Sequence, residues 1–350
     1  MEPTTAEEQS GKRATINDIA RIVGVSKVTV SYVLNAREGR VKITERTRQR
    51  VFEVAKELNY SSNALARSLA NRKTNTLTLV TQDPRILSAD SAFVTQLVRS
   101  VAKAAFEAEY DLILHTKPAA DINAEVSAIM DGRVDGALLL RDRDDPVGQT
   151  LTERGFPNVN IFSHGTSPNE ISVDIDNVRG EAMAVEYLIG LGHKRIAHIS
   201  GSLSSAAILE RVQGYRLAMD AANLPIHENW VVNIPNPQAD YAGLNDLLNS
   251  PDAPTALVVW SDDVAMAAMV YLRSQFGLSV PEDLSVVGFD STSICNLCMP
   301  RLTSMRQPIE EMAATAVKTL VDAIEKRPIL ENRIVFKPEL VERESCAAPK

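Results

Sequence analysis

The chain has 350 residues, 45% of them hydrophobic and 23% charged, which is enough for about two or three ordinary domains with substantial cores. A small scaffold held together by disulfides or metal ions is therefore excluded. No apolar run reaches the roughly 18 residues that a membrane-spanning helix requires, and residues 1–10 lack the apolar stretch of a secretory signal. The odd number of cysteines (Cys295, Cys298 and Cys346) is typical of a reducing compartment. We therefore expect a cytoplasmic protein with no membrane segment.

Charge is distributed unevenly along the chain. Residues 1–72 hold 13 Lys and Arg against 8 Asp and Glu, a net charge of +5, whereas residues 73–350 hold 24 against 37, a net charge of −13. A short basic module attached to a large acidic body is typical of a nucleic-acid-binding head whose body is repelled by phosphate. A solvated charged helical face has the same composition, so charge alone leaves both interpretations open.

The first structured segment predicts two short helices. Thr15 is a suitable N-cap, and Asp18 lies three residues later, where its charge favours the start of a helix. Gly24 ends this helix, and Ser26 caps a second one that extends to about Asn35. Two helices joined by such a turn form a helix-turn-helix, whose second helix fits the major groove of DNA. Many helical hairpins share this pattern, so the prediction is only moderately specific.

A third helix and a basic linker follow. Val51 and Val54 belong to an apolar stripe at helical spacing between Thr44 and Tyr60. Residues 62–72 are small, weakly apolar and basic, and they are too few to form a stable isolated helix in water.

From Thr76 onward, short apolar runs alternate with amphipathic helices. This alternation predicts an α/β fold with parallel sheets covered on both faces, and the length of the body indicates two lobes. The expected strands are 77–81, 112–115, 136–140, 159–162, 196–200, 256–260 and 285–289. The expected helices include 92–108, 178–190, 208–222 and 264–276.

Signals for cofactors, metals and catalysis are missing. The chain has no G-x-G-x-x-G, G-x-x-x-x-G-K-[ST] or G-x-S-x-G motif. The usual sequence signals for dinucleotide binding, nucleoside triphosphate binding and esterase activity are therefore missing. Cys295 and Cys298 supply only half a zinc site and are expected to be buried as small apolar residues. The histidines have no metal-ligand spacing; they are His115, His164, His193, His198 and His227. We predict no cofactor, no metal ion and no enzymatic activity.

Several blocks resemble one family in the order in which that family has them. They are ATINDIARIVGVSKVTVSYVLN at residues 14–35, YSSNALARSLA at 60–70, GHKRIA at 192–197, RVQGY at 211–215, DDVAM at 262–266, LSVVGFD at 284–290 and LTS at 302–304. Together they span nearly the whole chain, which is identified as a member of the LacI/GalR family of transcriptional regulators.

The resemblance implies a small all-α helix-turn-helix head and an α/β periplasmic-binding-protein-like body. The body would consist of two Rossmann-like subdomains that the chain crosses three times, with a ligand in the cleft at the carboxyl ends of the strands. The expected parts are a leader (1–13), the DNA-binding head (14–60), a hinge (61–74) and an effector-binding and dimerisation body (75–346), whose lobes would be 75–175 with 303–328 and 176–300 with 329–346.

In this family the start of the second helix reads base edges, which implies Lys27, Val28 and Tyr32 as readers. Lys can donate to guanine, Val can contact a thymine methyl group, and Tyr has a polar tip. Many relatives have Arg where this chain has Tyr32, so the base preferred there stays open. The other DNA contacts expected in the head are caps or phosphate contacts; they are Thr15, Ser26, Thr29, Ser31 and Asn35.

The family's hinge folds when a dimer binds DNA, and a leucine wedges into the minor groove. By position this leucine is Leu69, with Asn63, Ala66 and Arg67 nearby. An apolar wedge unstacks a base step, and the resulting bend creates contacts elsewhere. The alternative for Leu69 is an ordinary apolar residue on a core helix.

For the effector, the resemblance implies that Arg211, Asp262 and Asp290 hydrogen-bond the ligand. The alternatives are a helix N-cap for Asp262 and a surface ion pair for Arg211. Aromatic residues could stack on a sugar face, although core packing explains them equally well; they are Phe93, Tyr241, Trp260 and Phe289.

These observations predict a homodimeric, ligand-responsive transcriptional repressor that acts in the cytoplasm and is associated with the nucleoid when bound. Its partners would be pseudo-palindromic operator DNA and a small-molecule effector, with carbohydrate as the favoured class. Two alternatives remain open, a small-molecule binding protein of transport and an α/β enzyme with an appended head.

Overall fold

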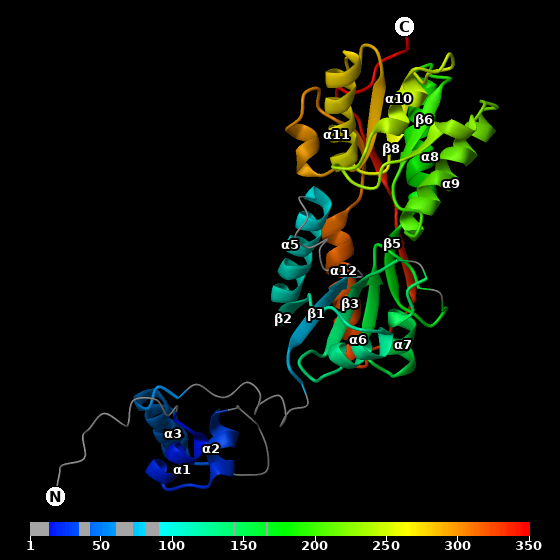
Figure 1. Ribbon diagram of the computed structural model, residues 1–350. Helices are drawn as coiled ribbons and strands as arrows, with labels where there is room; N and C mark the ends of the chain where they lie inside the picture. Colours follow the sequence, from blue (N-terminus) through cyan, green and yellow to red (C-terminus); the bar gives the residue numbers. More distant parts are fainter. Residues whose placement is uncertain (1–13, 35–42, 61–72, 82–90, 143, 166) are drawn as a thin grey trace, which may run out of the picture. The chain divides into compact units, whose positions relative to one another are not determined.

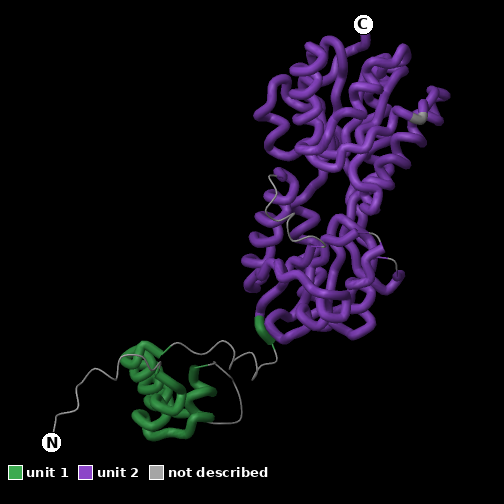
Figure 2. The backbone as a smooth tube through the Cα atoms, viewed as in Figure 1, with its two compact units in different colours: residues 1–74 green, residues 75–350 purple. Residues whose placement is uncertain are grey.

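In the computed structural model of the protein, the described residues are 14–34, 43–60, 73–81, 91–142, 144–165 and 167–350. Figure 1 shows their helices and strands, and Figure 2 marks two compact units, residues 1–74 and 75–350. Within this described part, no helix is both long and apolar enough to cross a membrane.

The described residues of the first unit form three helices around a small apolar core. As predicted, Asp18 Oδ2 accepts hydrogen bonds from the backbone N–H and the hydroxyl of Thr15, at 2.9 and 2.7 Å. Gly24 ends the first helix with φ of +75°, a conformation that glycine adopts without strain. The helices are α1 (Ile16–Val23), α2 (Lys27–Leu34) and α3 (Glu45–Glu57). Their shared core consists of Ile19, Ala20, Val30, Val33, Val51, Val54 and Ala55.

In the described part of the second unit, a first parallel six-stranded sheet has the order β11-β5-β4-β3-β1-β2. Helices α5 and α12 pack on one face of the sheet, and the residues of α6 and α7 belong to the apolar cluster of the other face. The strands are β1 (Thr76–Thr81), β2 (Asp111–His115), β3 (Gly136–Leu140), β4 (Asn158–Ile161), β5 (Ser172–Ile175) and β11 (Arg333–Phe336). The helices are α5 (Ala92–Glu107), α6 (Ile122–Ile129), α7 (Val147–Glu153) and α12 (Ile309–Ile324).

A second six-stranded sheet has the order β12-β10-β9-β8-β6-β7, in which only the β10–β12 pair is antiparallel. Its strands are β6 (Ile196–Ser200), β7 (Val231–Asn233), β8 (Ala256–Val259), β9 (Ser285–Asp290), β10 (Thr303–Arg306) and β12 (Glu339–Val341). The α-helices around it are α8 (Asn177–Gly190), α9 (Ala206–Ala221), α10 (Ala242–Leu248) and α11 (Asp262–Tyr271), and the short helical turns are η2 (Glu228–Trp230), η3 (Leu272–Phe276) and η4 (Ser293–Asn296).

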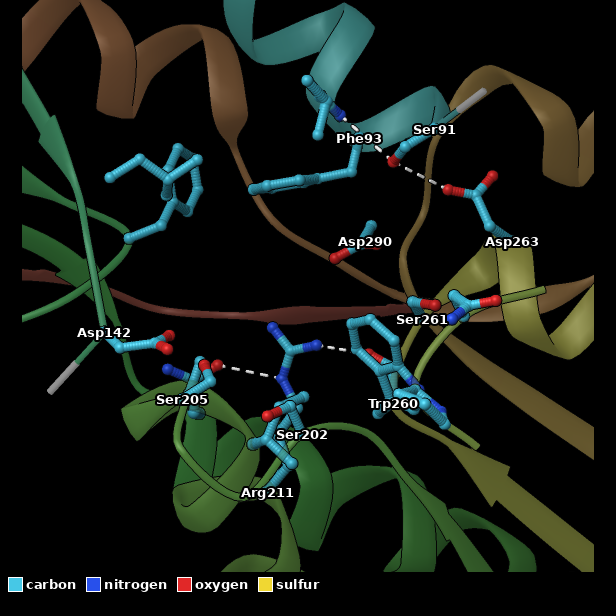
Figure 3. A pocket seen from close by; sticks show the side chains of 18 of the residues that line it. Ser91, Phe93, Asp142, Ser202, Ser205, Arg211, Trp260, Ser261, Asp263 and Asp290 are labelled. Atoms are coloured by element: carbon cyan, nitrogen blue, oxygen red, sulfur yellow. Dashed lines mark hydrogen bonds between the residues drawn. The ribbon is translucent and has the colours of Figure 1, made fainter. Parts of the chain in front are cut away.

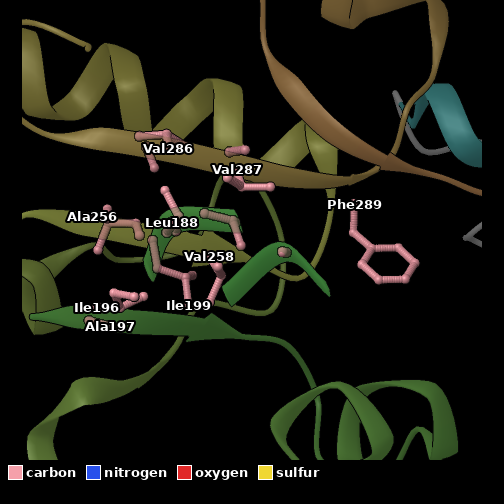
Figure 4. Packing of buried hydrophobic residues seen from close by; sticks show 14 of the residues in the cluster. Leu188, Ile196, Ala197, Ile199, Ala256, Val258, Val286, Val287 and Phe289 are labelled. Carbon is pink, nitrogen blue, oxygen red and sulfur yellow. The ribbon is translucent and has the colours of Figure 1, made fainter. Parts of the chain in front are cut away.

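The core of this second sheet is built from the apolar runs of its strands. Figure 4 shows Ile196, Ile199, Val258 and Val286 packed together with Leu188 of α8, and all five are at most 1% exposed. Such burial supplies about 25 cal/mol of stabilisation for each Å² of apolar surface.

The close approach of α8 and α9 depends on Gly214. A Cβ atom at this position would lie 2.2 Å from the backbone oxygen of Val178, so a larger residue would push the two helices apart.

The chain passes between the two sheets three times, after β5, after β10 and after β11. We call the part around the first sheet the first lobe (75–175 and 309–336) and the part around the second sheet the second lobe (177–306 and 339–350). The predicted lobe boundaries are wrong at two places, because β10 pairs with β9 in the second lobe and β11 pairs with β5 in the first.

Candidate functional sites

The second helix of the head presents part of its surface outside the core. Val30 and Val33 are buried against the other two helices, whereas Lys27 and Val28 at the start of α2 are exposed and Tyr32 is half-buried. Val28 is 54% exposed although it is apolar, which is the arrangement expected of a side chain that meets a thymine methyl group. The three predicted readers therefore retain accessible surface on one short helix.

Hydrogen bonds stabilise the start of this helix. Ser26 Oγ accepts a hydrogen bond from the backbone N–H of Thr29 at 3.1 Å, and the two hydroxyls lie 2.9 Å apart. Ser31 is half-buried on the same helix, and Thr15 belongs to the cap of α1. The other predicted DNA contacts lie outside the described residues; they are Asn35, Asn63, Ala66, Arg67 and Leu69.

A cavity of about 510 Å³ lies between the two lobes of the body. Its lining includes residues at or just after the carboxyl ends of strands in both sheets: Thr81, Asp142, Phe162 and Asp174 of the first lobe, and Ser202, Pro235, Trp260 and Asp290 of the second. The carboxyl ends of parallel strands are where ligands bind in α/β folds of this kind.

Arg211 of α9 is held rigidly in the wall of the second lobe. Its Nε donates to Asn177 Oδ1 at 3.0 Å, its Nη1 donates to the backbone oxygen of Trp260, and its guanidinium carbon lies 3.6 Å from the centre of the Phe289 ring. Burial lowers the pKa of Arg211, and the nearby Asp290 acts in the opposite direction. Figure 3 shows Arg211 directed into the cavity beside Trp260. The predicted surface ion pair is wrong, because Arg211 is only 5% exposed.

Asp290 ends β9 at the cavity with an unusual backbone. Its φ is +112°, a region that residues other than glycine rarely adopt and that is often found at functional sites. Its Oδ1 accepts a hydrogen bond from Gln307 Nε2 at 2.6 Å. Burial raises the pKa of this carboxyl well above its ordinary value, against the effect of Arg211.

Aromatic rings from both lobes supply apolar surfaces in the cavity. Phe93 of α5 packs edge-on against Phe162, with ring centres 5.0 Å apart. Trp260 of the second lobe donates from Nε1 to the backbone oxygen of Ile234 at 2.9 Å, which holds its indole in place. The polar lining includes Asp142, Ser202, Ser205, Asn236 and Gln238.

Comparison with known proteins identifies both parts of the chain. Residues 15–63 match the model of bacterial regulatory proteins of the lacI family, and residues 185–346 match the periplasmic binding protein-like domain. The chain is 34% identical to the HTH-type transcriptional regulator CelR of Thermobifida fusca over 95% of this chain and 98% of CelR. It is 32% identical to the ribose operon repressor of Escherichia coli over 95% of this chain and all of the relative. The chain belongs to the LacI family.

Solved structures of LacI-family regulators share the fold. A complex of CelR with cellobiose has a TM-score of 0.72 at 32% identity and covers 95% of this chain and 100% of that one. The lac repressor dimer bound to operator and the anti-inducer ONPF has a TM-score of 0.83 at 25% identity, covering 96% of this chain and 100% of that one.

Hydrogen bonds join the lobes of this LacI-family body at two places across the cleft. Ser91 Oγ, at the N-cap of α5, donates to Asp263 Oδ2 of α11 at 2.9 Å, and the backbone N–H of Ala92 donates to the same oxygen at 3.2 Å. Ser204 Oγ of the second lobe donates to Asp142 Oδ2 of the first at 2.8 Å. Burial raises the pKa of Asp263. The Ser91–Asp263 bond is visible beside the cavity in Figure 3.

Asp262, which the sequence assigned to the effector, does not line the cavity. Its Oδ2 accepts from the backbone N–H of Thr292 at 2.7 Å, and its Oδ1 accepts from Ser304 Oγ at 2.6 Å, so it ties α11 to β10 and to the loop after β9. The alternative as an N-cap is also wrong, because Ser261 caps α11. The residue after it, Asp263, lies in the cavity lining instead.

Tyr241 also lies outside the cavity lining. Its ring stacks on Tyr271 at 5.1 Å inside the apolar core of the second lobe, so core packing explains this residue. Phe289 is fully buried beneath Arg211 and reaches the site only through it. Of the predicted effector residues, the cavity therefore brings together Phe93, Arg211 and Asp290, with Trp260 beside them.

Proposed function

We propose that this protein is a homodimeric transcriptional repressor whose affinity for a pseudo-palindromic operator changes when a neutral carbohydrate binds the cavity. The observation that carries the proposal is the rigid pair of Arg211 and Asp290, set among aromatic faces in the cleft of a body that follows a helix-turn-helix head. A sugar ring has an apolar face and a rim of hydroxyls, which aromatic and charged side chains recognise together.

The charges in the cavity favour a neutral ligand over a phosphorylated one. Four aspartates line it, Asp142, Asp174, Asp263 and Asp290, against Arg141 and Arg211. Arg141 is already paired with Glu125 at 2.7 Å and with Asp145 at 2.6 Å. Even with burial favouring the protonated forms of Asp263 and Asp290, a phosphate group would lie against acidic side chains, and Arg211 is the one arginine outside an ion pair among the described lining residues.

The cavity volume is also suitable for a sugar. About 510 Å³ falls within the roughly 300–1,000 Å³ typical of small-molecule sites and leaves room for one or two sugar rings. The relative CelR was solved with cellobiose, which supports the extension of this ligand class to the present chain.

The hydrogen bonds between the lobes couple ligand binding in the cleft to operator binding by the head. A ligand that contacts both walls stabilises the closed cleft relative to the open one, and the affinity for operator changes by the same factor as the affinity for ligand. We propose that the protein has no enzymatic activity and acts in the cytoplasm on nucleoid DNA, because its relatives are named as regulators.

The test is a selection of random duplex DNA by the full-length protein, with and without neutral sugars and their phosphorylated counterparts. We expect a palindromic motif whose enrichment changes with one neutral sugar and not with its phosphate ester. Enrichment that responds only to the phosphate ester would overturn the choice of effector. No enriched motif at low or moderate salt would favour a transport protein or an enzyme instead.

A further inference from the structure

Three side chains that could bind a metal ion meet beside the cavity, from segments far apart in the sequence. His164 follows β4 and Asp174 lies on β5, both in the first lobe, whereas Glu210 lies on α9 of the second lobe. His164 Nδ1 is 3.5 Å from Asp174 Oδ2 and 3.8 Å from Glu210 Oε1, and the three ligand atoms all lie within 4.8 Å of one another. The cluster therefore bridges the two lobes.

In both Asp174 and Glu210, the carboxylate oxygen that does not face His164 accepts a hydrogen bond. Asp174 Oδ1 accepts from the backbone N–H of Ile175 at 2.8 Å, and Glu210 Oε2 accepts from Asn177 Nδ2 at 3.2 Å. These bonds hold both carboxylates so that their remaining oxygens face the imidazole. Outer hydrogen bonds of this kind orient the ligands in protein metal sites.

The imidazole faces its nearest carboxylate, Asp174, at 3.5 Å, which is longer than an ordinary hydrogen bond. His164 Nδ1 is shielded from solvent and has no hydrogen-bond partner among the described residues. The side chain of Asp174 is only 4% exposed. A shielded nitrogen at this distance from a buried carboxylate is satisfied either by a protonated imidazole or by a further group bound between the two side chains.

The charge around the cluster is negative. Contact with Asp174 raises the pKa of His164, while burial, followed by the charge of Asp174, raises the pKa of Glu210. Arg333 and Arg211 are the cations close enough to influence the cluster. Within the part of the chain that the structure describes, neither carboxylate forms an ion pair with a lysine or an arginine.

We propose that His164 Nδ1, Asp174 Oδ2 and Glu210 Oε1 bind a divalent transition-metal ion that links the two lobes. Zinc fits the donor set best, since bonds of about 2.0–2.2 Å place tetrahedral ligands about 3.3–3.6 Å apart. A calcium ion would favour oxygen ligands alone. The spacing of the histidines in the sequence does not reveal this site, because its ligands come from three separate segments.

Three protein ligands leave one coordination position open. Asp174 lines the cavity, so the open position is available to water or to a hydroxyl of the effector. This last step depends on the proposed function, whereas binding of the metal does not. A ligand hydroxyl on the ion would couple metal binding to closure of the cleft.

The test uses full-length protein stripped of metal by a chelator, without DNA and without sugar. Titration with Co²⁺, followed by its visible absorption, and with Zn²⁺, followed by calorimetry, should give one ion per chain. His164→Ala and Glu210→Gln should each weaken binding by at least about 100-fold, and the nearly isosteric Gln preserves the hydrogen bond to Asn177. His227→Ala is the matched control, because His227 is exposed and its ring packs against Trp230, away from the proposed ligands.

Binding that is unchanged in His164→Ala, or equally weakened in His227→Ala, would overturn the proposal. Metal affinity should fall as the pH is lowered, because protonated side chains do not act as ligands. If no metal binds and acid alone tightens sugar binding, the cluster is a proton-dependent bridge and the metal proposal is wrong. One ion per chain without any response to sugars would retain the metal site and reject the proposed effector.

Discussion

The two walls of the cavity are built differently. In the second lobe, Arg211 is fixed by Asn177, by the backbone of Trp260 and by the ring of Phe289, all within the same lobe. In the first lobe, Asp142 and Ser91 form hydrogen bonds across the cleft to residues of the second. We infer from this difference that the second lobe would offer the proposed sugar a preformed surface, whereas the contacts of the first lobe would depend on closure of the cleft. A preorganised surface favours a high affinity for the ligand, and contacts that form only on closure couple ligand binding to the conformation of the body.

Removal of the preformed anchor should have the largest effect. Arg211→Ala deletes hydrogen bonds from a buried charged group and leaves Asp290 without its neutralising neighbour, which we expect to weaken sugar binding by about 3 kcal/mol, or more than 100-fold. Calorimetry with the sugar found by the selection measures this loss. Arg216→Ala, an exposed position on the same helix, should bind normally. Equal affinities for the two variants would show that the second wall is not the recognition surface.

The buried carboxyl of the same wall should make stability depend on pH. The pKa of Asp290 is raised in the folded protein, so its contribution to stability is complete below the ordinary aspartate pKa of about 4 and is lost as the pH rises toward the folded value. Asp290→Asn, which imitates the protonated form, should lack this decline. Thermal unfolding of both proteins between pH 4 and 8 provides the comparison, and parallel profiles would contradict the pKa shift.

The contacts across the cleft should have smaller effects. Ser91→Ala removes the hydrogen bond to Asp263 together with the N-cap hydrogen bond from the backbone N–H of Val94, and it should weaken sugar binding by about 1 kcal/mol, or roughly fivefold. A double-mutant cycle with Asp263→Ala should show a coupling energy of similar size in the sugar affinity. If the losses of sugar affinity in the two single variants simply add in the double variant, the Ser91–Asp263 hydrogen bond does not contribute to closure of the cleft.

The bond between Ser204 and Asp142 should contribute least. It is an exposed hydrogen bond, so Ser204→Ala should change sugar affinity by about twofold or less. The same calorimetry measures this effect. If Ser204→Ala lost more sugar affinity than Ser91→Ala, the Ser204–Asp142 contact would matter more for closure of the cleft than the Ser91–Asp263 contact.

Much of the fold follows from patterns within single segments. The predicted strands are confirmed to within one residue at each end, and the helix-turn-helix is confirmed with its cap and its turn. The strands β5, β7, β10, β11 and β12 were not predicted, because segments of three or four residues show no period unless, as for β4 and β8, they belong to an apolar run. The assignment of β10 and β11 to lobes fails for another reason. Which sheet edge a strand joins depends on tertiary packing rather than on its own residues.

The cavity shows the same division between local and non-local information. Arg211 and Asp290 are found from the resemblance and their positions on secondary structure, and both line the cavity. Asp263 was missed because its role depends on the N-terminus of α5, which is remote in the sequence. The prediction for the cysteines holds for Cys295, which is fully buried, whereas Cys298 is only half-buried.

The three passages between the lobes have a consequence for synthesis of the protein on the ribosome. The first sheet is completed only by β11, at Arg333–Phe336, and the second only by β12, at Glu339–Val341. The helices of the head, with their own apolar core, end at Glu57. Because domains generally fold as units from the N-terminus during translation, the head can form long before either half of the sensor is complete. A ribosome that stops between residues 60 and 330 would therefore release the head without a complete cleft for an effector.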